Sequence, residues 1–106
     1  MSMSKAANSL LSEGVLWEAA ECLRVMAHPL RLRMVEILMQ GGRPVHQIAR
    51  LCDLSPAQAC GHLRLLKGHG LLDSARKGRT VFYRIASRQL PGLIHCIRKN
   101  CDAKGT

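Results

Sequence analysis

The sequence contains five cysteines, whose thiols can bind metal ions or undergo redox reactions. They stand at Cys22, Cys52, Cys60, Cys96 and Cys101. No two of them form a CxxC pair, which argues against a closed structural zinc site. The N-terminal stretch lacks the basic start, apolar core and small-residue cleavage site of a signal peptide, so we expect a cytoplasmic protein. In that compartment the cysteines are expected to be free thiols rather than a disulfide framework.

Two of these thiols lie near the C-terminal end, on a helix expected to begin near Ser87 or Gln89 and to reach Cys101. Cys101 falls on the apolar stripe of that helix, whereas Cys96 lies about 120° away from the stripe and is expected to be more accessible. An ideal α-helix separates residues five apart by roughly 140° and 7.5 Å. One intact helix therefore cannot bring both sulfurs to one small ion. Either the helix end unwinds, or a partner such as Cys22 or the other subunit contributes.

Soft thiolates favour As(III), Sb(III) or other thiophilic ions. The neighbouring cations Arg98 and Lys99 suit a redox-sensing thiol as well. We therefore predict an inducer or redox site at Cys96, Cys101 and Cys22, and no permanently bound cofactor. Cys52 and Cys60 are interpreted as structural, since free cysteine is among the most frequently buried residue types.

Positive charge is the second chemical feature, and it is localised. The chain has 106 residues, with 16 Lys and Arg against 7 Asp and Glu and a net charge of +9. Between Gly61 and Arg88 there are seven cations and a single acid, Asp73. A folded domain this basic most often binds a polyanion, and nucleic acid is the leading candidate. An aromatic content of 3% argues against a stacking platform for single strands.

The elements that position these residues follow from hydrophobic periodicity and from Pro and Gly punctuation. The length predicts a single domain over 1–106, with flexible ends at 1–9 and 102–106. The first helix, over about 10–27, is expected to bury one stripe containing Val15, Ala19, Cys22, Leu23 and Met26. Further helices are expected at about 29–40, 44–52 and from Pro56 to Gly68, followed by a hairpin of 71–76 and 79–85 around Lys77-Gly78 and by the last helix. The prediction is a mainly α fold with a β-hairpin wing, a winged helix-turn-helix.

In such a fold the second helix of the turn enters the major groove of duplex DNA. Here that helix begins at Pro56 after the N-cap Ser55, and its core stripe is Ala59, Leu63 and Leu66. Residues pointing away from this stripe can approach base edges, and a cationic hairpin tip can reach phosphates. The predicted DNA-binding residues are Ser55, Ala57, Gln58, Gly61, His62, Arg64 and Lys67 of the helix, and Arg76, Lys77 and Arg79 of the wing.

Three runs of the sequence carry a family resemblance: LRVMAHPLRLRMVEIL, LSPAQACGHLRLLKGHGLL and RKGRTVFYRI. Together they resemble the ArsR/SmtB family of bacterial repressors over residues 20–101. The resemblance implies a homodimer on palindromic operator DNA, with the first and last helices at the dimer interface. It also implies release from DNA when a metal ion, a metalloid or an oxidant binds. The small size and the apolar stripes of both terminal helices agree with a dimer.

The family's metal sites are incomplete in this chain. The stretch Val45-His46-Gln47-Ile48 has no cysteine where one family site uses one. At the second site the matching residues are Ser87, Gln89, Asn100 and Ala103, none of which is a strong zinc ligand. The second helix also lacks the cysteine with which some relatives sense persulfide or peroxide.

Three interpretations stay open from the sequence. The first is a repressor released by a thiophilic inducer, and the second is the same repressor responding to oxidation or persulfidation. The third is a constitutive DNA-binding module with inert cysteines. An enzyme is not predicted, because no nucleophile–base spacing, paired carboxylates or phosphate loop stands out.

Overall fold

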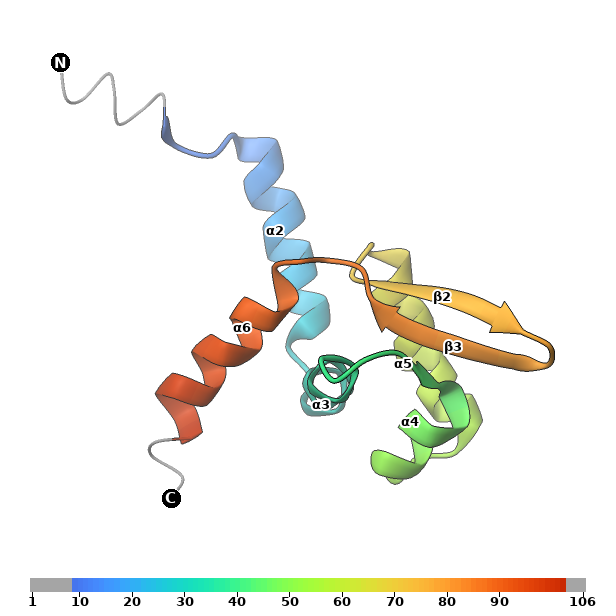
Figure 1. The fold of residues 1–106 in the computed structure, drawn as a ribbon. Helices are drawn as coiled ribbons and strands as arrows, with labels where there is room; N and C mark the ends of the chain where they lie inside the picture. Colours follow the sequence, from blue (N-terminus) through green and yellow to red (C-terminus); the bar gives the residue numbers. More distant parts are fainter. Residues whose placement is uncertain (1–8, 103–106) are drawn as a thin grey trace, which may run out of the picture.

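The computed structural model describes residues 9–102 and has the mainly helical architecture with a wing (Figure 1). The helices are α2 (Glu13–Met26), α3 (Pro29–Leu38), α4 (Val45–Leu51), α5 (Pro56–Gly68) and α6 (Leu90–Ile97), which continues as the π-helix η1 (Arg98–Asp102). The strands are β1 (Arg43–Pro44), β2 (Leu72–Lys77) and β3 (Thr80–Ile85), in the order β1-β3-β2 and antiparallel. The flexibility expected at the chain ends concerns mainly residues 1–8 and 103–106, which lie outside the described residues. No helix in the described range is long and apolar enough to cross a membrane.

The core lies where α3, α4, α5 and α6 meet the sheet. Met34 and Val35 of α3, Ile48 of α4 and Leu63 of α5 are fully buried. The predicted stripe of α5 is confirmed, because its other members are buried too. On α6, the stripe begins with Leu90 and Ile94 inside the core, and Leu93 and Ile97 pack against its edge. These contacts bury one face of α5 against the core and leave its opposite face exposed to solvent.

The start of α5 is held by a reciprocal cap. The Ser55 hydroxyl accepts a hydrogen bond from the Gln58 amide at 3.1 Å, and Gln58 Oε1 accepts one from the Ser55 amide at 3.0 Å. Pro56 occupies the first turn, where its missing N–H costs nothing. The turn from α4 reaches this point through Asp53, which has a positive φ of 58°. The predicted helix-turn-helix is therefore present, with its predicted boundary at Ser55.

The wing differs from the prediction by one residue. Lys77 pairs with Thr80, so the two-residue turn is Gly78-Arg79 rather than Lys77-Gly78. Gly78 has φ of 64°, which a type II′ turn requires at its first position. Arg79 is thereby placed at the tip. The short strand β1, which pairs with Phe82 and Tyr83 of β3, was not predicted.

Within a single chain the predicted stripe of α2 is mostly exposed, so its burial stays a prediction for the dimer. Of its five residues only Met26 is buried, while Val15 is 45% exposed and Leu23 58% exposed. Trp17 is 73% exposed, and Leu51 of α4 is 57% exposed. Figure 1 shows the reason for α2: its N-terminal part extends away from the other helices and strands that the structure describes.

Candidate DNA interface and cysteine sites

The outward face of α5 is exposed to solvent and includes the small residues Ala57 and Gly61. Ala57, Gln58, Gly61 and Arg64 are all exposed, as their angular positions predict. A Cβ placed on Gly61 would meet nothing within 4 Å, so this face can approach another surface closely. Ser55 is exposed as well, but its hydroxyl and the Gln58 side-chain oxygen are engaged in the helix cap. A base contact by Gln58 therefore has to involve its amide nitrogen or a rearranged cap.

Arg64 of α5 and Arg79 of the wing line the same cavity of about 250 Å³. Tyr83 forms its buried wall, and Cys60 lies in it one turn before Arg64. Burial raises the pKa of Tyr83, the adjacent Cys60 raises it further, and Arg64 lowers it through its charge and a side-chain hydrogen bond. Arg64 and Tyr83 both line this cavity. This cavity places cations of the helix and of the wing on one side of the molecule.

The wing carries the other predicted cations in exposed positions. Arg76, Lys77 and Arg79 all face solvent. The Lys77 ammonium lies 5.4 Å from the centre of the Phe82 ring, within range of a cation–π interaction. Lys67, at the end of α5, donates a 2.7 Å hydrogen bond to the Ser74 hydroxyl of β2. That bond connects the end of the helix to the wing.

His62 faces the interior side of α5 rather than the open face. Its Nδ1 atom accepts a 3.1 Å hydrogen bond from Arg31 of α3, and its ring packs edge-on against His28 with centroids 4.8 Å apart. His62 therefore makes a contact between helices in this structure, and its contact with DNA stays a prediction. The sequence held no signal for the contact between helices, because its two partners are 31 residues apart.

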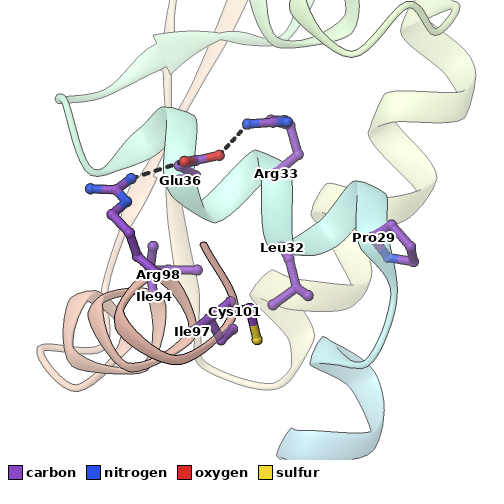
Figure 2. A pocket seen from close by; sticks show the side chains of 8 residues that line it. All are labelled: Pro29, Leu32, Arg33, Glu36, Ile94, Ile97, Arg98 and Cys101. Carbon is purple, nitrogen blue, oxygen red and sulfur yellow. Dashed lines mark hydrogen bonds and ion pairs between the residues drawn. The ribbon is translucent and has the colours of Figure 1, made fainter. Parts of the chain in front are cut away.

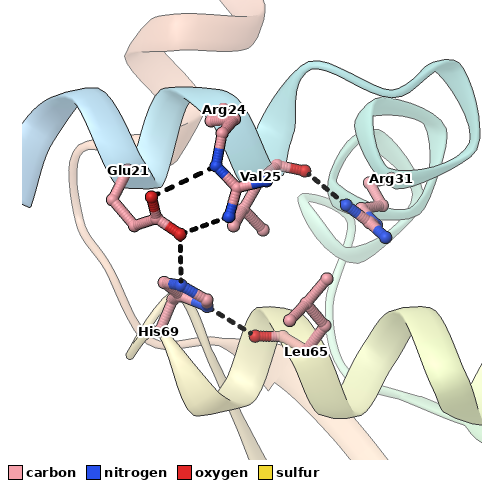
Figure 3. A network of polar contacts seen from close by, with 6 residues as sticks. All are labelled: Glu21, Arg24, Val25, Arg31, Leu65 and His69. Carbon is pink, nitrogen blue, oxygen red and sulfur yellow. Dashed lines mark hydrogen bonds and ion pairs between the residues drawn. The ribbon is translucent and has the colours of Figure 1, made fainter.

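A second polar network joins α2 to α5 (Figure 3). The Glu21 carboxylate binds Arg24 in a bidentate pair and lies 3.7 Å from Nε2 of His69, whose Nδ1 atom is 3.1 Å from the Leu65 carbonyl. Arg31 also donates to the Val25 carbonyl at 3.0 Å. The C-terminal half of α2 is therefore attached to α5 at two places, once through His69 and once through Arg31.

Cys101 lines a different cavity, of about 370 Å³, between α3 and the end of α6 (Figure 2). Its walls include Leu32 and Ile97, and Glu36 at its rim binds both Arg33 and Arg98. Cys101 is an exposed thiol, as is Cys96, whose sulfur accepts a 3.5 Å hydrogen bond from the Asn100 amide. The π-helical turn over Arg98–Asp102 means that the ideal α-helical separation between the two cysteines does not hold.

The remaining thiols are half-buried at Cys22, Cys52 and Cys60. Burial raises the pKa of Cys52, with a smaller opposite effect of Arg33, which agrees with a structural role. Within the residues that the structure describes, no three His, Cys, Asp or Glu side chains are gathered to hold a metal ion. A site made of Cys22, Cys96 and Cys101 therefore needs a second subunit or a rearrangement.

Comparisons with known proteins agree with this architecture. A helix-turn-helix domain family matches residues 26–75. The HTH-type transcriptional repressor SmtB of Mycobacterium tuberculosis is 32% identical over 80 residues, which are 76% of this chain and 59% of that protein. The transcriptional repressor PagR of Bacillus anthracis is also 32% identical over 80 residues, or 74% of this chain and 80% of PagR.

Solved structures show the same fold. The crystal structure of PagR has a TM-score of 0.71 at 30% identity and covers 81% of this chain and 99% of that one. The solution structure of a homodimeric winged helix-turn-helix DNA-binding domain from Mycobacterium bovis, described as a possible ArsR-family regulator, has a TM-score of 0.75 at 28% identity. It covers 89% of this chain and 90% of that one.

The similarity reaches over only part of some relatives. The chain spans 59% of the length of SmtB and 39% of an HTH-type transcriptional regulator of the same organism. Over the winged helix-turn-helix, however, the matches to PagR cover most of both chains. With the cap at Ser55, the stripe of α5 and the wing all in place, the chain belongs to the ArsR/SmtB family.

Proposed function

We propose that this chain is a DNA-binding transcriptional repressor, not an enzyme, that reads duplex operator DNA as a cytoplasmic homodimer. The observation that carries the proposal is the shared cavity of Arg64 and Arg79, since it places the open face of α5 and the tip of the wing on one side. A helix fits the major groove, and cations of a wing can neutralise phosphates beside it. The names of the relatives SmtB and PagR as transcriptional repressors support the same role.

The exposed apolar surface of α2 supports the dimer. Leu16, Trp17 and Leu23 are each more than half exposed, and their side chains gain free energy when a second subunit covers them. The homodimeric neighbour from Mycobacterium bovis points the same way. A two-fold dimer presents two copies of α5, which fits a palindromic site.

The experiment is selection of binding sites from random duplexes, followed by titration of the full chain against the selected duplex and a scrambled one. We expect a palindromic site bound at least about a thousandfold more tightly than the scrambled duplex. Equal affinities for both duplexes would contradict operator reading and leave a non-specific DNA binder.

For the inducer, we propose the thiols Cys96 and Cys101 of α6 and η1, joined by Cys22, as the site for a thiophilic ion such as As(III). Support comes from the exposure of Cys96 and Cys101 and from the cavity that Cys101 enters. Anaerobic titration of the reduced protein–operator complex with arsenite tests this proposal, with Cys96→Ser/Cys101→Ser as the variant and Cys52→Ser as the matched control. Release by stoichiometric arsenite, lost only in the double variant, is the expected result.

Two other outcomes identify the alternatives. Release by peroxide or persulfide but not by arsenite would replace the metalloid with a redox signal at the same thiols. No release by any of these agents would indicate a constitutive DNA-binding module with inert cysteines.

A further inference from the structure

Cys60 is placed differently from the structural thiol that the sequence predicts. It lies on α5, the helix of the open face, and lines the 250 Å³ cavity between α5 and the wing. It is half-buried, so a reagent can reach it. Cys52, the other thiol interpreted as structural, lines none of the cavities described for this chain and has a pKa raised by burial. The two thiols therefore have different chemical surroundings.

The cavity beside Cys60 has two cations set among apolar walls from Val45, Pro56 and Val81. The cations are Arg64 and Arg79, and His46 of α4, Thr80 and Tyr83 also line the cavity. No carboxylate is among its lining residues, which are Val45, His46, Pro56, Cys60, Arg64, Arg79, Thr80, Val81 and Tyr83. Pockets for drug-sized ligands measure about 300–1,000 Å³, so this cavity suits a smaller group. Charge and size together fit a small anionic substituent attached to the cysteine.

We propose that Cys60 is a site of S-thiolation by an anionic, carboxylate-bearing disulfide, and that this modification and DNA binding through α5 exclude each other. The Cys60 thiolate attacks one sulfur of the disulfide. A new S–S bond forms as the old one breaks, and the other half leaves as a thiolate that takes up a proton. The disulfide is the only co-reactant, and the products are the mixed disulfide at Cys60 and one free thiol.

The exclusion follows from where the added group lies. It occupies the space between Arg64 and Arg79, and its carboxylates neutralise the cations that face the phosphates in the proposed complex. This second part rests on the proposed function, whereas the reactivity of Cys60 does not. The site is separate from Cys96 and Cys101, which lie at the end of α6 and in η1.

The test measures modification at each cysteine by mass spectrometry, using the full reduced chain. The probes are oxidised glutathione, which is anionic, and cystamine, which is cationic, each normalised to its rate with a free model thiol. We expect the normalised rate at Cys60 to be roughly tenfold higher with oxidised glutathione than with cystamine, because a positively charged cleft attracts the anionic reagent. The Arg79→Gln variant should lower this preference. Arg76→Gln removes the same charge from a wing residue that does not line the cavity, and it should leave the preference unchanged.

The operator complex supplies the second arm. Bound operator should slow modification at Cys60 but not at Cys96 or Cys101, and Cys60→Ser should keep its operator affinity in oxidised glutathione. The proposed site would be overturned if Cys60 did not react. It would also be overturned if neither Arg79→Gln nor Arg76→Gln changed the preference for oxidised glutathione over cystamine. A complex in which Cys60 reacts as fast as in the free chain would overturn the exclusion. If the chain bound no duplex, the proposed function would be overturned instead. The modification rates of the free chain would still test the proposed site at Cys60.

Discussion

Arg31 donates a hydrogen bond from Nε to Nδ1 of His62 at 3.1 Å, and so connects the start of α3 to the middle of α5. The same guanidinium donates to the Val25 carbonyl near the end of α2 at 3.0 Å. Three helices that are separate in the sequence therefore meet at one side chain. The acceptor atom must be unprotonated, which makes this connection sensitive to the charge of His62.

The first prediction concerns acid stability. Burial, and then the charges of Arg31 and His28, lower the pKa of His62 below its ordinary value of 6.5. The unfolded chain takes up a proton at that ordinary pKa, whereas the folded chain takes one up only at a lower pH. The free energy of unfolding therefore becomes smaller, and the protein less stable, as pH falls below 6.5. Chemical denaturation at about pH 7.5 and pH 5.5 measures this loss. The His62→Gln variant should show a smaller loss than the native chain, and an identical pH dependence would remove His62 as its source.

The second prediction concerns base reading by Arg64. Arg64→Ala should weaken binding to the selected operator by about 1–3 kcal/mol, the range for a good base contact, and should weaken binding to a scrambled duplex less. Because Tyr83 lines the same cavity as Arg64, Tyr83→Phe should reduce the same preference to a smaller degree. Fluorescence anisotropy with both duplexes measures the two affinities. A loss of equal size on both would assign Arg64 to phosphates.

The third prediction concerns the wing. Lys77→Ala or Arg79→Ala should weaken binding to all duplexes and flatten the plot of log affinity against log salt concentration by up to about 0.9 for each lost phosphate contact. Titrations between about 50 and 200 mM salt give this slope. Lys99→Gln, which removes one charge from η1, is the matched control and should leave the slope unchanged. If the wing variants kept the native slope, the wing would not touch the backbone.

The fourth prediction concerns Trp17. Its side chain is 73% exposed in one chain, so Trp17→Ala should cost the isolated subunit little stability. In the proposed dimer a buried tryptophan is a typical energetic centre, and its loss should weaken association by about 2 kcal/mol, or roughly 30-fold. Sedimentation equilibrium measures the dissociation constant. Arg24→Ala, on the same helix, is the comparison, and an equal effect of both variants would argue against a specific role of the tryptophan.

The predictions of the fold that are confirmed depend on local signals in the sequence. Ser55 followed by Pro56 marks the start of α5, and the spacing of Ala59, Leu63 and Leu66 identifies its buried side. Both signals act over one or two turns of helix and need no partner. The wing turn is displaced by one residue because Gly78 takes the turn position that requires a positive φ, a choice that depends on the strand register.

The errors concern contacts that periodicity does not encode. A stripe on α2 predicts an apolar surface, but not whether the same chain or another one covers it. Strand β1 has two residues, one of them Pro44, and its pairing with Phe82 and Tyr83 joins segments about forty residues apart in the sequence. No sequence pattern links His62 to Arg31, so their hydrogen bond could not be predicted.

The hydrogen bond between Lys67 and Ser74 has a consequence for the choice of duplex. Together with the packing of α5 against β2, it helps to set the spacing between α5 and the wing tip in the free protein. A duplex whose groove width matches that spacing binds without distortion, whereas a wider or narrower one must deform. On the proposed function, base pairs that neither element touches therefore influence affinity through the stiffness of the double helix.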